Sequence, residues 1–308
     1  MATSSRERST RSKGRIMEAV TFHREPELRN PSLIAAWPGM GGVAIIAAKH
    51  LKDELGAEEL GDIKPYDFFD LGAVSVVDHV VGAPEFPESK FYFWKSGGEK
   101  DLIIFLGEAQ PAMRGYQLAN LVLDVAQRFK AKRVYTFAAA PAHIYHTRRP
   151  KILGAATHPE LIQELQRNDV TPMAAGTISG LNGLLLGVAR ERNMEGICLL
   201  GEIPVYTTPI PNPKSSKAVL EVLTKLLDIE VDLAGLEEWA GRAEEETEEN
   251  IQALRESHAE EASRLLDYFD QLKQASAEEE IREPLEISTE ELLAEVERFL
   301  RRKREDGN

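Results

Sequence analysis

The sequence predicts an α/β protein built on a largely parallel sheet that helices cover on both faces. Short apolar runs of strand length alternate with helix-length amphipathic segments from residue 32 to residue 227. This alternation is typical of parallel sheets, because parallel strands need crossover helices between them. An aromatic run at 91–95, a Ser-Gly-Gly-Glu turn and an apolar run at 102–107 predict one antiparallel hairpin inserted in the sheet.

The remaining elements are expected in alternating order along the chain. A glycine-rich turn at 39–42 opens a buried helix that ends near Gly56, a residue type common just after helices. We expect further strands at 32–36, 68–69, 74–77, 133–139 and 196–200, with a short one near 173, and helices at 116–129, 159–166, 184–189 and 216–227. The segment 58–65 is a poor candidate for a core strand, and 141–157 is expected to be a long loop.

The chain divides into three parts by composition. Residues 1–17 are polar and basic and are expected to be a disordered leader. Residues 18–235 form the α/β domain, and 236–308 form an acidic helical extension. Within the extension we expect helical structure over 240–272, then a linker, then a last helix over 292–300 that a capping box opens. The helical part has one expected apolar stripe, which consists of Ile251, Leu254, His258, Leu265, Tyr268, Phe269 and Leu272. The stripe would pack on the body or on a partner, and both options stay open.

Composition excludes several classes of protein. The net charge of −14 argues against a nucleic-acid binder, because no excess of Lys and Arg is present to meet phosphates. The single cysteine, Cys198, excludes an internal disulfide and a cysteine zinc site. The sequence contains no run of eighteen or more apolar residues, so no membrane span is predicted. The N-terminal segment lacks the apolar core of a secretory signal. We therefore expect a cytoplasmic protein.

The turn at 39–42 has two possible roles. Three glycines at the start of a helix can hold a phosphate or another anion on bare amide groups, or can simply let the chain turn tightly. Gly39, Gly41 and Ala44 also fit a dinucleotide fingerprint, for which acids at 58–62 would bind the ribose. Pro38 and the poor strand at 58–65 argue against that use, so we predict a packing turn and no cofactor.

Two glutamates follow glycines at predicted strand ends. Glu108 and Glu202 could act as acid and base, could hold a metal, or could accept hydrogen bonds from backbone amides of neighbouring loops. The sites of parallel sheets lie at the carboxyl ends of strands, so we expect the loops after residues 36, 106, 139 and 201 to gather at one edge.

The loop after residue 140 and a second glycine-rich turn supply the other candidates. His143 and His146 have a spacing that is only a weak metal signal without a third ligand, so no metal is predicted. Arg148 could bind an anionic ligand or a partner. Ser179 lacks the surroundings of a nucleophilic serine, and Asn182, between glycines, suits a bond to backbone. No catalytic residue is therefore assigned.

The glycine motifs together resemble the PAC2 family, proteins similar to proteasome assembly chaperone 2. The matching motifs are Pro-Gly-Met-Gly at 38–41, Gly-Glu at 107–108, Gly-Thr-Ile-Ser-Gly-Leu-Asn-Gly-Leu-Leu at 176–185 and Gly-Glu-Ile-Pro at 201–204. The resemblance covers about 30–235, and the acidic helical extension is similar to that of longer bacterial members.

The resemblance implies a three-layer α/β/α sandwich like that of purine nucleoside phosphorylase, without that activity. It also implies homo-oligomers and, for archaeal and eukaryotic relatives, a non-enzymatic role in binding proteasome subunits during assembly. Some of those chaperones dock through a C-terminal hydrophobic-Tyr-any tripeptide. This sequence ends in Asp306-Gly307-Asn308, which argues against docking through the tail.

Two hypotheses of function follow. The first is a protein-binding module of the PAC2 family, with proteasome subunits as possible partners by resemblance and with neither nucleic acid nor membrane as a partner. The alternative is an enzyme that acts on a small anionic ligand at the strand-end loops. Both hypotheses draw on one set of candidate ligand or partner residues: Gly39, Met40, Gly41, Gly42, Glu108, His143, Arg148, Ser179, Asn182 and Glu202.

Overall fold

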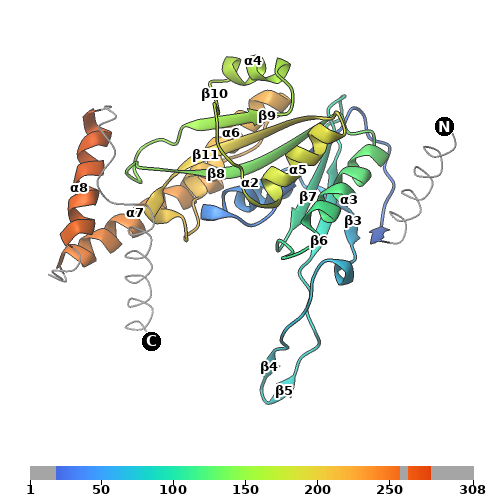
Figure 1. The fold of residues 1–308 in the computed structure, drawn as a ribbon, viewed down its shortest axis with the longest axis horizontal. Coiled ribbons are helices and arrows are strands. Elements are labelled where there is room, and N and C mark those ends of the chain that lie inside the picture. Colours follow the sequence, from blue (N-terminus) through green and yellow to red (C-terminus); the bar gives the residue numbers. More distant parts are fainter. Residues whose placement is uncertain (1–18, 257–262, 279–308) are drawn as a thin grey trace.

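The computed structural model describes residues 19–256 and 263–278 and shows a large central sheet with helices on both faces (Figure 1). The strand order is β1-β3-β6-β7-β2-β8-β11-β9-β10. The mixed α/β class predicted from the alternation of strands and helices is confirmed. The expected leader at 1–17 and the expected last helix at 292–300 lie outside the described residues.

Four parallel strands form the centre of the sheet. They are β7 (Leu102–Gly107), β2 (Ser32–Ala36), β8 (Arg133–Ala142) and β11 (Glu195–Pro204), each paired in parallel with the next. All six residues of β7 are buried, as expected for a strand that helices cover on both faces. Because the four strands run in one direction, their carboxyl ends lie at one edge, as predicted. Strands β8 and β11 extend three residues beyond the expected ends at 139 and 201, so Glu202 lies within β11, paired with Ala140.

Antiparallel strands extend the sheet on both sides. On one side β6 (Ser89–Trp94) forms the predicted hairpin with β7, and β3 (Glu58–Ile63) and β1 (Val20–Phe22) follow it. On the other side β9 (Ile152–Ala156) runs antiparallel to β11, and the two-residue β10 (Thr171–Pro172) completes the edge.

Three expectations about local structure were wrong. The segment 58–63 is a strand, because Leu60 and Ile63 reach the core while its acidic residues stay at the exposed side. The segment 141–157, expected to be a loop, contains β9. The sequence of β9 is short and rich in small residues, and it forms a strand because its backbone pairs with β11. No strand forms at 68–69, where the chain turns after the 3-10 helix η2 (Pro65–Asp67).

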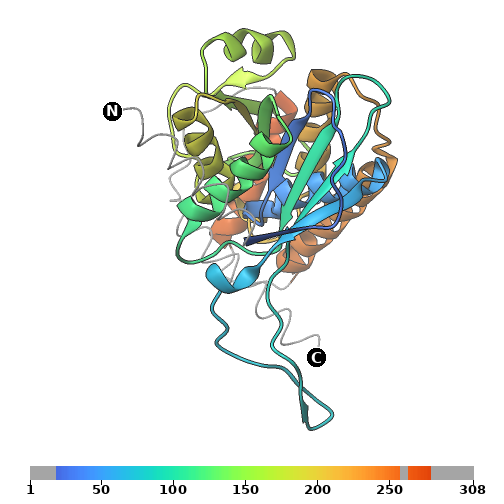
Figure 2. The same ribbon diagram turned by 90° about the vertical axis from the view of Figure 1, so that its right-hand side faces the viewer.

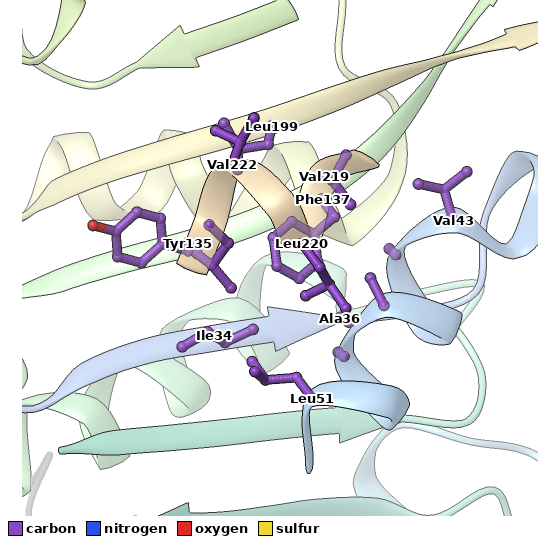
Figure 3. Close-up of a cluster of buried hydrophobic side chains, with 14 of the residues drawn as sticks. Ile34, Ala36, Val43, Leu51, Tyr135, Phe137, Leu199, Val219, Leu220 and Val222 are labelled. Carbon is purple, nitrogen blue, oxygen red and sulfur yellow. The ribbon is translucent and has the colours of Figure 1, made fainter. Parts of the chain in front are cut away.

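Helices cover each face and create two separate cores. On one face α2 (Val43–Glu54) and α6 (Pro213–Leu227) pack on the sheet and bury residues such as Phe137 and Leu199 (Figure 3). On the other face α3 (Gly115–Arg128) and α5 (Gly180–Glu191) bury a second cluster. Helix α5 begins four residues earlier than expected, directly at Gly180. The short α4 (Glu160–Arg167) lies between β9 and β10.

The acidic extension packs on the body. Helix α7 (Ala234–Glu256) lies along α6, and α8 (Ser263–Glu278) follows it. The predicted apolar stripe, apart from His258, which lies outside the described residues, is buried in one cluster with Tyr145, Val205 and Tyr206 of the body. The stripe therefore covers the body, which was one of the two options left open.

Residues 66–88 leave the body as a long arm, which both views show projecting away from the sheet and its helices (Figures 1 and 2). Its far end is a separate two-stranded sheet formed by β4 (Val76–Val77) and β5 (Val80–Val81). None of the helices in the described ranges has the length and hydropathy needed to cross a bilayer.

We predict that Leu199→Ala lowers the free energy of unfolding by about 3 kcal/mol, because the side chain is fully buried between the sheet and α6 and its removal leaves a cavity. The matched control is Leu71→Ala on the arm, where the leucine is exposed and a change below about 0.5 kcal/mol is expected. Urea denaturation of both variants checks the prediction, and equal effects would contradict it.

Candidate functional site

The two glycine-rich turns meet through one buried side chain. The Asn182 Oδ1 accepts a hydrogen bond from the Trp37 backbone N–H at 3.1 Å, and its Nδ2 donates to the Trp37 carbonyl at 3.2 Å. Trp37 follows the last residue of β2, and Asn182 lies in the first turn of α5, 145 residues later. The side-chain amide thus takes the place of a strand partner and fixes the start of α5 at the carboxyl end of β2.

A second amide joins the loop after β7 to the same place. The Gln110 Nε2 donates to the Pro38 carbonyl at 2.6 Å, and its Oε1 accepts from the Leu181 backbone N–H at 2.8 Å. Asn182 is buried, whereas Gln110 is exposed to solvent. We call the set Trp37, Pro38, Gln110, Leu181 and Asn182 the junction.

Glycines around the junction are required by close contacts. A Cβ at Gly107 would overlap the Trp37 indole, and one at Gly183 would overlap the Ile178 carbonyl. Gly180 has a φ of +72°, and a Cβ there would meet the Gln110 side chain at 2.7 Å. The repeated glycines of the sequence therefore let three loops approach one another without side chains between them.

The backbone amides of the first turn are largely used within the protein. The Gly41 N–H donates to the Thr208 carbonyl at 2.8 Å, the Gly42 N–H to Gly39 at 3.0 Å, and the Val43 N–H to Met40. Gly41 has a φ of +61°, and a Cβ there would lie 3.1 Å from Asn212 and 3.2 Å from Ile203, closer than an ordinary contact. Three of the four amides over 40–43 thus have carbonyl partners, so this turn offers few donors to an anion.

The acids of the possible dinucleotide fingerprint lie far from that turn. They belong to β3, and the order β3-β6-β7-β2 places them about 14 Å across the sheet from β2, at three strand spacings. Glu58 pairs with Arg24, whereas Glu59 and Asp62 both contact His23. These contacts fasten the sheet edge near β1.

Glu108 and Glu202 do not converge. Their strands, β7 and β11, are separated by β2 and β8, which corresponds to about 14 Å. Glu108 Oε2 accepts from the Glu88 backbone N–H at 2.8 Å, and Glu202 Oε2 accepts from the Lys151 N–H at 3.0 Å. Each carboxylate thus ties a neighbouring loop to a strand end, which is the role in backbone capping that the sequence left open.

The loop between β8 and β9 forms a polar and aromatic cluster with the extension. The Tyr206 hydroxyl accepts from the His146 backbone N–H at 2.8 Å and lies 3.0 Å from His146 Nδ1. The His146 Nε2 lies 3.3 Å from the Glu248 carboxylate of α7, which also accepts a 2.5 Å hydrogen bond from the Tyr145 hydroxyl. Lys273 of α8 contacts the other oxygen of Glu248 at 2.9 Å.

Burial decides the protonation of this cluster. Desolvation lowers the pKa of His146 to about 4, and the opposing attraction of Glu248 is smaller. Hydrogen bonds from Tyr145 and Lys273 hold the pKa of Glu248 below its ordinary value. Burial raises the pKa of Tyr206 well above its ordinary value. At neutral pH a neutral imidazole therefore lies between a neutral phenol and a carboxylate.

The other candidates divide between this cluster and a small cavity beside it. The His143 Nδ1 lies 3.0 Å from the Tyr268 hydroxyl of α8. Arg148 and Glu202 both line a cavity of about 30 Å³, together with Lys214 of α6 and Glu244 of α7. This volume has room for one or two water molecules. Within the described ranges, no three His, Cys, Asp or Glu side chains stand close enough to hold a metal.

Two of the candidates present side chains at the carboxyl edge. Met40 and Ser179 are exposed there, and the Ser179 hydroxyl, at the start of α5, does not cap the helix. The structure thus brings Gly39 close to Asn182, and Arg148 close to Glu202. It does not bring the two glutamates, or the two histidines with a third ligand, into one reactive site.

Sequence reasoning missed the residues that complete both groups. Gln110 and Glu248 lie 71 residues from Leu181 and 103 from Tyr145, their partners, and no local pattern links them. The single available signal was that Gln110 stands in the Gly-Glu-Ala-Gln-Pro strand end, which was expected at the same edge as the glycine-rich turns.

Comparisons with known proteins place these motifs in a family. The profile of the PAC2 family matches residues 33–251, from β2 into α7. An uncharacterised protein of Methanocaldococcus jannaschii is 33% identical over 216 residues, which are 69% of this chain and 80% of that protein.

Solved structures show the same fold. The crystal structure of Pyrococcus furiosus PbaB, described as an archaeal proteasome activator, is 31% identical with a TM-score of 0.65, over 75% of this chain and 97% of that chain. Pyrococcus furiosus PbaA, described as an archaeal homologue of proteasome-assembly chaperone, is 22% identical with a TM-score of 0.58, over 82% and 99%.

We predict that the buried and the exposed amide of the junction differ in their effect on stability. Asn182→Ala leaves the Trp37 N–H and carbonyl buried without partners and should lower the free energy of unfolding by about 3 kcal/mol. Gln110→Ala removes as many hydrogen bonds, but water can replace them, so about 1 kcal/mol or less is expected. Denaturant unfolding checks this order, and the reverse order would contradict it.

We also predict that His146 makes stability depend on pH. Its pKa is about 4 in the folded chain and 6.5 ordinarily, so between pH 6.5 and 4 the unfolded chain binds a proton that the folded chain does not. The contribution of His146 to the free energy of unfolding should therefore be complete above pH 6.5. It should be lost as the pH falls toward 4, by at most about 3 kcal/mol. In His146→Gln the loss between pH 7 and 4.5 should be smaller, and an unchanged loss would refute the assignment.

Proposed function

The chain belongs to the PAC2 family, and from this membership we propose that it is a protein-binding module that acts on the proteasome during assembly or activation. The observation that carries the proposal is the similarity to the Pyrococcus furiosus proteasome activator, at 31% identity and over 97% of that chain. The proposal includes a homo-oligomeric, cytoplasmic protein and a role that needs no catalytic residue.

The geometry of the junction supports a binding role. The side chains of Asn182 and Gln110 bind two backbone amides and two backbone carbonyls of the meeting loops, whereas the indole N–H of Trp37 is buried without a hydrogen-bond partner in the described residues. Glu108 and Glu202 are each held by a backbone amide. A rigid edge of this kind suits the presentation of a surface to another protein, because its shape is fixed before binding.

We propose the carboxyl edge of the parallel strands as the contact face for the partner. Met40 projects there with about half of its surface exposed, and Leu184 of α5 is exposed as well. Ser179, which directly precedes α5, is exposed as well and carries a hydroxyl. A flexible, apolar methionine next to polar groups is a common composition for a contact between proteins.

The test is binding of the full-length protein to proteasome α subunits and to the complete core particle of the same organism, measured by light scattering and by surface plasmon resonance. We expect association with one of the two, and Met40→Glu should weaken it at least tenfold, because a charge would then be buried in the contact. Trp239→Glu, at an exposed position of α7, is the matched control and should bind like the original protein.

The two forms of the proposal give different results. An assembly factor binds free α subunits, whereas an activator binds the complete core and raises its peptidase rate. Failure to bind either one, with the protein folded, would overturn the proposal.

A further inference from the structure

The arm at 66–88 exposes apolar side chains that the body does not cover. Val76, Val77, Val80 and Val81 are each about two-thirds exposed, although valine is typical of buried strands. They form the tip patch. The turn between β4 and β5 is a two-residue hairpin turn in which Asp78 and His79 have positive φ, at 50° and 66°.

Such an arm is not expected to be stable alone in water. A two-stranded hairpin is marginal without a third strand or a covering surface. Here β4 and β5 pair only with each other, so the outer edges of both strands lack a partner strand within the described residues. Four exposed valines and two open strand edges together indicate that another surface covers the tip patch.

A second exposed apolar group lies where the arm leaves the body. Tyr66 is 72% exposed, Met113 is 69% exposed, and Tyr116 is half exposed at the start of α3. Arg114 holds these parts together, since its guanidinium donates to the Asp67 carbonyl at 2.7 Å. We call Tyr66, Met113 and Tyr116 the root patch.

The charges of the arm are mixed at its root and acidic at its tip. Of the five acids over 66–88, only Asp78 lies in the tip turn, whereas Asp67 and Glu88 lie where the arm leaves the body. The root carries the exposed Lys64 and also Arg114, whose side chain is 57% exposed and whose guanidinium lies 3.9 Å from the Asp67 carboxylate. The tip of one copy therefore matches the root of another in apolar character, and the charge of Asp78 is opposite to those of Arg114 and Lys64.

We infer that the arm packs antiparallel against the arm of a second copy, so that each tip patch covers the partner copy's root patch. A two-fold axis between the copies forms both contacts at once. The tip patch of the first copy covers the root patch of the second, and the same rotation places the tip patch of the second on the root patch of the first. In this dimer Asp78 of each chain lies beside Arg114 of the other. The inference concerns self-association and holds whether or not the protein binds a proteasome.

The test is the mass in solution of the full-length protein, measured by sedimentation equilibrium. We expect a mass of two chains, or a multiple of it. Val77→Asp combined with Val80→Asp should shift the protein to the mass of one chain, while Trp239→Asp, another exposed apolar position, should leave the mass unchanged. Circular dichroism and thermal unfolding verify that each variant is folded.

A charge exchange makes the test specific for the partner. Asp78→Arg or Arg114→Asp alone should weaken self-association at least tenfold, and the two together should restore it. Aspartate tolerates the positive φ of 63° at position 114 better than most residues, so the variant adds little backbone strain there. Restoration by the pair also excludes strain at the turn as the cause of the single effects.

Three results would overturn the inference. The first is a monomer at all concentrations. The second is an oligomer that neither the valine nor the charge variants weaken, which would place the interface elsewhere. The third is loss of partner binding without any change of mass, which would assign the arm to the partner protein instead.

Discussion

The side-chain amide of Asn182, bound to both backbone groups of Trp37, is the contact on which the arrangement of this protein depends. It ends the central strand β2 and starts helix α5 at one point, although the two lie 145 residues apart. Because both backbone groups are buried, no water can take the place of the asparagine. The glycines at 107, 180 and 183 leave the room that this contact needs.

This contact assigns the glycine-rich motifs a role in packing and not in binding an anion. In the sequence they suggested a phosphate cradle as one alternative, yet the amides over 41–43 donate to carbonyls of the chain itself. The motifs build a closed, hydrogen-bonded edge. The contacts that we propose with other chains use exposed side chains around that edge and on the arm, which lie outside the junction. The extension adds a second connection, in which the hydrogen bond from the Tyr145 hydroxyl to Glu248 joins α7 to the loop after β8.

The sequence predicted those elements whose own residues carry the pattern. Strand β7 has six consecutive apolar residues, and α3 repeats its apolar positions at helical spacing, so both were found within a residue or two. Strand β3 was not predicted, because its acidic residues and its glycine outnumber the two residues that point into the core. Strand β9 was not predicted, because it is a strand through its pairing with β11 and not through its composition. The candidate asparagine was recognised as a backbone ligand, but its partner Trp37 and the second amide of Gln110 depend on the folded topology.

Hydrogen exchange of the Trp37 and Leu181 backbone amides tests most directly whether the junction is the constraint that holds the fold together. Both are donors to junction side chains, at 3.1 and 2.8 Å. The account predicts that the Trp37 amide exchanges only through global unfolding, with the same opening free energy as the amides of β7 and β8. Exchange of the Trp37 amide through a local opening several kcal/mol below the global value would contradict it.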